Sequence, residues 1–209
     1  ISTAADVTKN DTIDGGEGTD TLQLAGTLDY STAGAGTDDA SGIKGFEVLS
    51  AGAAAVSQDM TGLAKNNTIT SVTVGASEAL TLTKDTAITD VTITGNSGTL
   101  SMASAGTQTV NIAGDTGGTD VPSRVTGASV TSGATAINLV SAGSDALGDN
   151  TVSLLGTALT SITVTGTEDV QVTANKSKVL ATADFSGSTA EEVSLDASLS
   201  EVALTYKTG

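Results

Sequence analysis

The sequence of 209 residues contains no cysteine, no histidine and no tryptophan. Without cysteine, the fold cannot rely on disulfides, and a thiolate zinc site is excluded. Without histidine, the commonest general base and the commonest ligand of transition metals are both missing. Four aromatic side chains, Tyr30, Phe46, Phe185 and Tyr206, are too few for a platform on which sugars or bases stack. These absences favour a structural or binding role, and we do not expect an enzyme.

Positive charge is also scarce. Lysine and arginine number 8 against 24 aspartates and glutamates, which gives a formal net charge of −16. Nucleic acids and anionic membrane surfaces attract clustered basic residues, so we expect neither as a partner. Apolar stretches such as residues 53–56 are far too short to span a bilayer, so no transmembrane segment is expected. Because oxygen ligands suit hard cations, the composition favours calcium as the bound ion.

The sequence begins at Ile1 without a methionine or an apolar signal segment, so we interpret it as an excised fragment or a mature segment of something larger. Threonine alternates with valine, isoleucine and leucine along much of it, which is typical of strands and not of disordered linkers. No long apolar stripe of helical period is present. An all-β fold is therefore expected.

A pattern of spaced residues, U-x-x-U-x-U, recurs along the chain. The U positions are apolar in the clear copies. The copies are Ile43-Phe46-Val48, Ile69-Val72-Val74, Ile88-Val91-Ile93, Thr107-Val110-Ile112, Ala134-Ile137-Leu139, Leu159-Ile162-Val164, Ala190-Val193-Leu195 and Leu199-Val202-Leu204. The copies that start at positions 69, 88 and 107 are evenly spaced, and the clearest ones are followed by a second short apolar pair, such as Leu80 and Leu82. One unit of the repeat therefore holds two short strands and two turns in about 19 residues.

A single unit of this kind cannot bury its apolar face alone, but stacked units bury a continuous core. The repeat predicts a parallel β-solenoid, a β-roll or β-helix with rungs of about 19 residues, in which Val72, Val91 and Val110 form one inward column. Antiparallel β-sandwich domains are the alternative, because strands every 8–12 residues suit them as well. Residues 114–130 break the pattern and contain the only proline, Pro122, so a loop or insertion is expected there.

Near the N-terminus, residues 15–23 read GGEGTDTLQ and match G-G-x-G-x-D-x-U-x at every specified position. Glycines allow backbone angles that point carbonyls at one ion, the aspartate supplies charge, and the next apolar residue turns into the core. Two nonapeptides further on, residues 33–38 read AGAGTD, and aspartates recur at the nonapeptide spacing. The predicted metal-site residues are Asp11, Gly15, Gly16, Glu17, Gly18, Asp20, Asp29, Gly34, Gly36 and Asp38. An ordinary surface turn without an ion is the alternative.

Residues 10–23 resemble the RTX repeats of proteins exported by type I secretion. The threonine- and alanine-rich remainder, with rungs such as TSVTV, is similar to RTX-containing bacterial S-layer proteins. The resemblance implies a secreted, acidic structural protein that self-associates with calcium into a lattice on the bacterial cell wall, with a cell-envelope polysaccharide as a further partner. It divides the chain into calcium-binding turns at 1–42 and a solenoid at 43–209. Only one perfect nonapeptide is present, whereas secreted RTX toxins and proteases carry long arrays.

Two other functions remain open at this point. The first is a calcium-stabilised adhesin or spacer module of a larger secreted RTX protein, with ice binding through Thr-x-Thr pairs as a special case. The second is a β-helical lyase or hydrolase that uses paired carboxylates. Its candidate pairs are Asp38/Asp39, Glu168/Asp169 and Glu191/Glu192. Adjacent residues of a strand point to opposite faces, so the spacing alone brings none of these pairs together.

Overall fold

The protein is a parallel β-solenoid, as the repeat predicted. The structure, a computed structural model, describes residues 2–3, 12–27, 42–52, 54–85, 87–113, 124–143 and 149–209. All strand pairs in this part of the chain are parallel. The antiparallel sandwich is thereby excluded, because its neighbouring strands would run in opposite directions.

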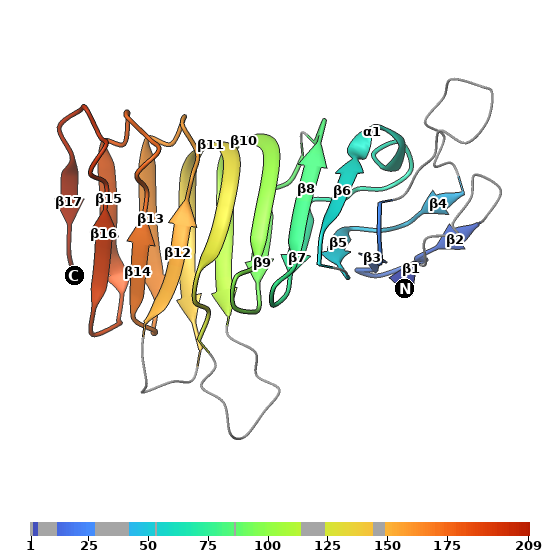
Figure 1. The fold of residues 1–209 in the computed structure, drawn as a ribbon, viewed down its shortest axis with the longest axis horizontal. Helices are drawn as coiled ribbons and strands as arrows, with labels where there is room; N and C mark the ends of the chain where they lie inside the picture. Colours follow the sequence, from blue (N-terminus) through green and yellow to red (C-terminus); the bar gives the residue numbers. More distant parts are fainter. Residues whose placement is uncertain are drawn as a thin grey trace.

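The strands form two walls that stack rung upon rung along one axis (Figure 1). The first wall contains β1 (Ser2–Thr3), β3 (Thr21–Leu24), β5 (Val48–Ala51), β7 (Ser71–Val74), β9 (Asp90–Ile93), β13 (Ser161–Gly166), β15 (Thr182–Ser188) and β17 (Thr205–Lys207). The second wall contains β6 (Val56–Asp59), β8 (Ala79–Thr83), β12 (Asn150–Leu154), β14 (Val170–Thr173) and β16 (Val193–Asp196). A short helix, α1 (Met60–Leu63), follows β6, and β2 (Ile13–Asp14) pairs with β4 (Ile43–Lys44) in a separate small sheet.

Two long strands, β10 (Thr99–Ala113) and β11 (Ala128–Ala142), belong to both walls. Their first halves pair within the second wall and their last halves within the first. The pairing of β10 with β11 shifts register on both sides of Gly106, whose φ is +88°. A backbone angle of this kind is open to glycine at little cost, so Gly106 lets β10 turn the corner of the solenoid.

The core is built from columns of side chains that share a register. The central column of the first wall contains Leu22, Leu49, Val72, Val91, Val110, Leu139 and Val164, each paired with the next. Each of these side chains is at most 1% exposed. Adjacent strands lie about 4.8 Å apart, so consecutive members of the column pack directly on one another. The predicted column of Val72, Val91 and Val110 is confirmed, and it extends over four further rungs.

The rung length is less regular than predicted. Ser71, Asp90 and Thr109 are in register and evenly spaced along the chain, at the interval that the repeat predicted. Other rungs are longer: Thr182 is in register with Ser161, and Asn138 with Thr109. Strand register depends on the strands alone, so corners of different length fit into the same stack.

Three details of the expected pattern are corrected. In β5 the side chain of Val48 is only half-buried, and Leu49 and Ala51 face inward in its place, because Phe46 already fills the interior at the preceding corner. The expected loop ends earlier than residue 130, since Val125 is buried and β11 starts at Ala128. Residues 114–123 lie outside the described part of the chain. The last copy of the pattern, Leu199-Val202-Leu204, is exposed.

Candidate metal site

The nonapeptide turn connects β2 to β3 at the N-terminal end of the solenoid. Gly16 and Gly18 have φ angles of +92° and +119°, a region that side-chain-bearing residues rarely adopt. Gly15 is required for a different reason: a Cβ at this position would lie 2.0 Å from the carbonyl oxygen of Gly45. The first glycine therefore allows close approach of the stacked rung, and the other two shape the turn itself.

The rung that stacks on this turn consists of residues 44–48. The amide of Gly15 donates to the Lys44 carbonyl at 3.0 Å, and the amides of Glu47 and Val48 donate to the Asp20 carbonyl at 3.2 and 3.1 Å. The amide of Asp20 donates to Oε2 of Glu47 at 2.9 Å. Two consecutive rungs are thus joined at the aspartate of the motif.

The interval between these rungs is longer than the two nonapeptides on which the predicted partner turn was based. Ile13 is in register with Ile43, and Thr21 with Val48, so the described rung that stacks on the turn starts at β4. The remaining predicted site residues, Asp11, Asp29, Gly34, Gly36 and Asp38, lie outside the described residues. The neighbour that the structure places against the turn is the segment around Glu47.

Asp20 carries the unusual feature of the site. Its backbone amide and carbonyl are both hydrogen-bonded, but Oδ2 of its side chain is buried and has no hydrogen-bond partner. A buried carboxylate oxygen without a donor costs free energy unless a cation or a donor compensates it. Because this aspartate is the charged residue of the nonapeptide, the orphaned oxygen fits the chemistry of a calcium ligand.

The other acidic residues of the turn are less suited to hold an ion. Oδ1 of Asp14 accepts a hydrogen bond from the Gly16 amide at 3.1 Å, and Oδ2 lies 2.8 Å from Nζ of Lys44. The hydrogen bond from Lys44 lowers the pKa of Asp14, so its charge is already compensated. Glu17 is exposed. No group of three or more Asp, Glu, His or Cys side chains converges within the described residues.

Glu47 was missed by the sequence analysis, although a signal for it exists. Aligning TLQL of β3 with VLSA of β5 places Asp20 opposite Glu47, the residue before each strand. The prediction relied on a second glycine-rich turn and therefore passed over a carboxylate that precedes an ordinary strand. In a solenoid, strand register is the better guide to which side chains meet.

The described carboxylate pairs of the enzyme hypothesis lie near the other end of the solenoid. Glu191 and Glu192 are exposed, and the Glu192 amide donates to Oδ1 of Asp169 at 2.8 Å. This bond connects two consecutive rungs at a corner, as ordinary turn aspartates do. Asp38 and Asp39 lie outside the described residues.

A cavity of about 270 Å³ lies between α1 and the corner that precedes β9. Met60, Ile69 and Ile88 form its apolar lining, and Lys84 and Asp85 contribute charge. Both charges are engaged. Nζ of Lys84 lies 2.8 Å from Oδ2 of Asp59. Asp85 accepts hydrogen bonds from the amides of Ala103 and Ser104, as well as from the Ser104 hydroxyl. The polar groups of the cavity therefore hold the corners together.

The fold and the turn define the class: an acidic parallel β-solenoid with a glycine-rich candidate metal site at its N-terminal end. Comparisons with protein-family models, with curated proteins and with solved structures gave no match. The helix found in the described part of the chain is too short to cross a membrane.

Proposed function

We propose that this chain is a structural segment of a secreted bacterial cell-surface protein, which binds calcium at its N-terminal turn and self-associates into an S-layer lattice. The observation that carries the proposal is the buried, unpartnered Oδ2 of Asp20 within a complete nonapeptide motif. Type I secretion and contact with a cell-envelope polysaccharide belong to the same proposal through the resemblance to RTX proteins.

Asp20 and Glu47 would hold the ion together with backbone carbonyls of the turn. Calcium accepts six to eight oxygen ligands in flexible geometry, so two carboxylates and several carbonyls suit it. The ion supplies positive charge that compensates carboxylates on two stacked rungs. Because those rungs are also joined by the Gly15 and Asp20 amides, binding would order the N-terminal end of the solenoid.

Electrostatics supports the calcium dependence of assembly. At a net charge of −16, two copies repel one another in solution, which keeps the secreted chain dispersed. The outer surfaces of the walls carry hydroxyl columns, such as Thr73 beside Thr92 and Ser153 beside Thr173, which make individually weak contacts. A lattice built from such surfaces needs many repeated contacts and divalent cations that neutralise the repulsion.

Calorimetric titration of the protein with calcium tests the site. Asp20→Asn removes the orphaned charge with little change of shape, and we expect it to weaken binding at least about tenfold. Asp196→Asn is the matched control, because Asp196 is exposed at the opposite end of the solenoid and caps the Ser198 amide. Unchanged calcium binding in Asp20→Asn would exclude this turn as the site.

Light scattering followed by electron microscopy tests the assembly. We expect calcium in roughly the millimolar range, the regime of extracellular calcium modules, to produce ordered sheets that a chelator disperses. Magnesium should act more weakly, because its small octahedral shell fits carbonyl-lined turns poorly. If the protein stays monomeric over this range, the lattice proposal fails.

A calcium-stabilised adhesin or spacer module of a larger secreted RTX protein is the second candidate. One observation favours it: β1 and β17 lie toward opposite ends of the stack (Figure 1), which is the geometry of a rod that separates two attachments. Calcium binding without assembly, combined with binding to a cell or glycan surface, would support this function.

A further inference from the structure

The motif Asn-x-Ser/Thr, with any residue except proline at x, occurs three times in the chain, at Asn10, Asn66 and Asn175. It is the acceptor sequence for N-glycosylation, in which a sugar is attached to the carboxamide nitrogen of the asparagine. So short a motif also arises by chance in a sequence rich in serine and threonine, and its structural setting decides whether an enzyme can use it. Asn10 lies outside the described residues, but the structure distinguishes the other two copies.

The Asn66 copy lies in the turn that follows α1. Asn66 and Thr68, which carries the hydroxyl of the motif, are both exposed. Within the part of the chain that the structure describes, neither the Asn66 carboxamide nor the Thr68 hydroxyl forms a hydrogen bond. The acceptor nitrogen and the hydroxyl of the motif are therefore both accessible to an enzyme in the folded protein.

Asn67, the neighbour of the acceptor, fixes the backbone of this turn. Its Oδ1 accepts a hydrogen bond from the Phe46 amide at 3.1 Å, and its Nδ2 donates to the carbonyls of Ile43 and Leu63, both at 2.8 Å. The Asn66 carbonyl accepts from a backbone amide of the preceding rung at 3.3 Å. The turn is thus attached to the solenoid through its backbone and Asn67, while the Asn66 side chain stays exposed.

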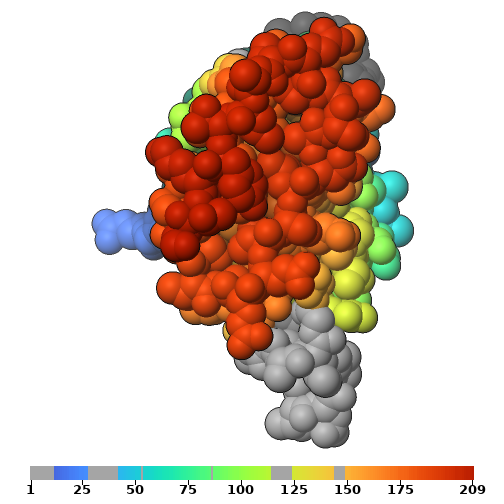
Figure 2. Space-filling model, turned by 90° about the vertical axis from the view of Figure 1, so that its left-hand side faces the viewer, coloured from blue at the N-terminus to red at the C-terminus, as the bar shows by residue number. Residues whose placement is uncertain are grey.

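The Asn175 copy is built into the fold. Its hydroxyl belongs to Ser177, which is fully buried and donates to the Leu159 carbonyl. The last described rung, whose residues form the surface seen in Figure 2, stacks on this corner, and its Glu201 amide donates to the Lys178 carbonyl at 2.9 Å. An enzyme cannot reach the hydroxyl of this copy in the folded protein, so the structure excludes it as an acceptor.

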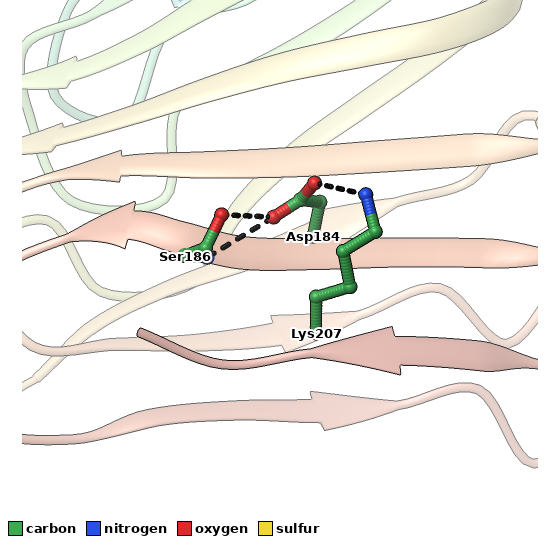
Figure 3. A network of polar contacts seen from close by, with 3 residues as sticks. All are labelled: Asp184, Ser186 and Lys207. Carbon is green, nitrogen blue, oxygen red and sulfur yellow. Dashed lines mark hydrogen bonds and ion pairs between the residues drawn. The ribbon is translucent and has the colours of Figure 1, made fainter.

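Hydroxyls near the strand ends of the solenoid commonly bond within the fold. The Ser186 hydroxyl donates to Oδ1 of Asp184 at 2.6 Å (Figure 3), and the Ser200 hydroxyl donates to the Leu180 carbonyl at 2.8 Å. Thr68 makes no such bond within the described residues, so its hydroxyl has no part in holding its corner together. This difference separates the Asn66 copy of the motif from a chance occurrence in a packed corner.

A place for the first sugar lies beside the acceptor. The cavity of about 270 Å³ between α1 and the corner that precedes β9 is lined by Ala64, Asn67 and Thr68, which lie on both sides of Asn66 in the chain. Its lining combines apolar side chains with the hydroxyls of Thr68 and Thr70. A pyranose ring has an apolar face of C–H groups and a rim of hydroxyls, so it matches a lining of this composition.

We propose that Asn66 is an N-glycosylation site of the folded protein and that the first sugar packs into this cavity. The carboxamide nitrogen of Asn66 forms a bond to the anomeric carbon of a sugar diphosphate. The bond from this carbon to the diphosphate oxygen breaks, and the diphosphate leaves with the electron pair. A base of the transferring enzyme takes one amide proton, and nothing is oxidised or reduced. The diphosphate of the donor carries either a nucleoside or a lipid.

This modification goes beyond the proposed function, because it needs neither calcium nor self-association. Peptide mass spectrometry of the protein isolated from the cells that make it tests the modification. We expect the peptide that contains Asn66 to carry sugar and the peptide that contains Asn175 to carry none. A wild-type protein without sugar on Asn66 overturns the proposal and leaves the calcium site and the lattice untouched.

Two substitutions of an exposed side chain show whether the motif is read. Thr68→Ala removes the hydroxyl and keeps Asn66, so it should abolish the modification. Thr68→Ser retains the hydroxyl and should retain the sugar. Thermal melting of both variants should match that of the wild type, because the Thr68 hydroxyl bonds to nothing in the described chain. Sugar that persists on Asn66 in Thr68→Ala would contradict recognition of the motif.

Transfer to unmodified protein, made in a host without N-glycosylation, distinguishes the two donors. The folded protein is incubated with nucleotide sugars and either the soluble or the membrane fraction of the producing cells. Transfer to Asn66 by the soluble fraction indicates a nucleotide-linked donor, and transfer by the membrane fraction alone indicates a lipid-linked one. No transfer to Asn66 in either arm, or equal transfer to Asn175, overturns the proposal. A peptide of residues 172–180 should accept sugar, and its failure would contradict burial as the reason that Asn175 is excluded.

Discussion

Two kinds of glycine make the N-terminal turn possible. Gly16 and Gly18 adopt positive φ angles, whereas Gly15 lies where the Gly45 carbonyl of the next rung comes too close for any side chain. The glycines of the motif therefore meet two requirements, the conformation of the turn and a close contact between two rungs. This contact gives the glycine at position 15 a role in stability that is independent of any ion.

We expect Gly15→Ala to destabilise the protein by about 2 kcal/mol, because the added methyl forces the two rungs apart. For a chain of this size, that corresponds to a melting temperature lower by about 4–8 °C. Gly26→Ala is the control, since a Cβ there meets nothing within 4 Å. Calorimetric melting in chelator compares the two variants, and an equal effect of both would contradict the close-contact explanation.

The central column gives a second prediction for single residues. Val91 is fully buried between Val72 and Val110, so Val91→Asp would bury a charge without a partner. We expect a loss of several kcal/mol, enough to abolish cooperative unfolding of a marginally stable domain. Thr92→Asp changes the neighbouring, outward-facing side chain of the same strand and should have little effect. Thermal melting followed by circular dichroism would reject the column if both variants behave like the wild type.

Among the elements, β17 is attached to β15 through a titratable contact. Asp184 accepts hydrogen bonds from the Ser186 hydroxyl and amide and from Lys207, at 2.6, 3.1 and 2.9 Å. The Ser186 hydroxyl, followed by Lys207, lowers the pKa of Asp184 from 3.8 to about 2. Because the pKa is depressed in the folded state, the stabilisation is present at neutral pH. It is lost as the pH falls from about 4 through 2.

We therefore expect β17 to loosen between pH 4 and pH 2, and Asp184→Asn to remove that part of the pH dependence. Tyr206 lies on β17 and is its fluorescent reporter once Tyr30, the only other tyrosine, is replaced by phenylalanine. Quenching of Tyr206 against pH measures the loosening. Asp196→Asn serves as the control, and an identical pH profile in Asp184→Asn and the wild type would refute this role of Asp184.

For the whole molecule, stacking is a nearest-neighbour arrangement. Each inner rung packs against two others, whereas an end rung packs against one, so stability is expected to fall toward both ends. Ligand binding at one end of such a stack stabilises the rungs near it more than distant ones. Calcium binding at the N-terminal turn should therefore stabilise the rungs near this turn more than the rungs far from it.

Hydrogen exchange measured by mass spectrometry tests this gradient. We expect the strongest protection in β9, β10 and β11, and weaker protection in β3 and β17. Calcium should raise the protection of β3 and β5, which flank Asp20 and Glu47, and leave β15 unchanged. A uniform increase along the chain would show that the rungs unfold together and would contradict the nearest-neighbour description.

The sequence by itself determined the fold class and the orientation of most core side chains. Strand alternation has a period of two, and stacked copies of one pattern place equivalent residues in register. Val72, Val91 and Val110 could therefore be assigned to one column from their spacing. The need for glycine at positions 16 and 18 was equally readable from the motif, because it depends on local backbone angles, whereas the need for Gly15 depends on a contact with the next rung.

Only the tertiary structure decided what lies against each rung. Corner lengths vary without disturbing strand register, so a spacing counted along the chain did not point to Glu47, whose side chain accepts a hydrogen bond from the Asp20 amide. The same holds for Gln108, which occupies an inward position in register with Ile137 and bonds the carbonyls of Ile88 and Ser104. These contacts join residues far apart in the chain. The local sequence pattern does not predict these contacts, because it specifies on which face of a strand a side chain lies and not which rung packs against it.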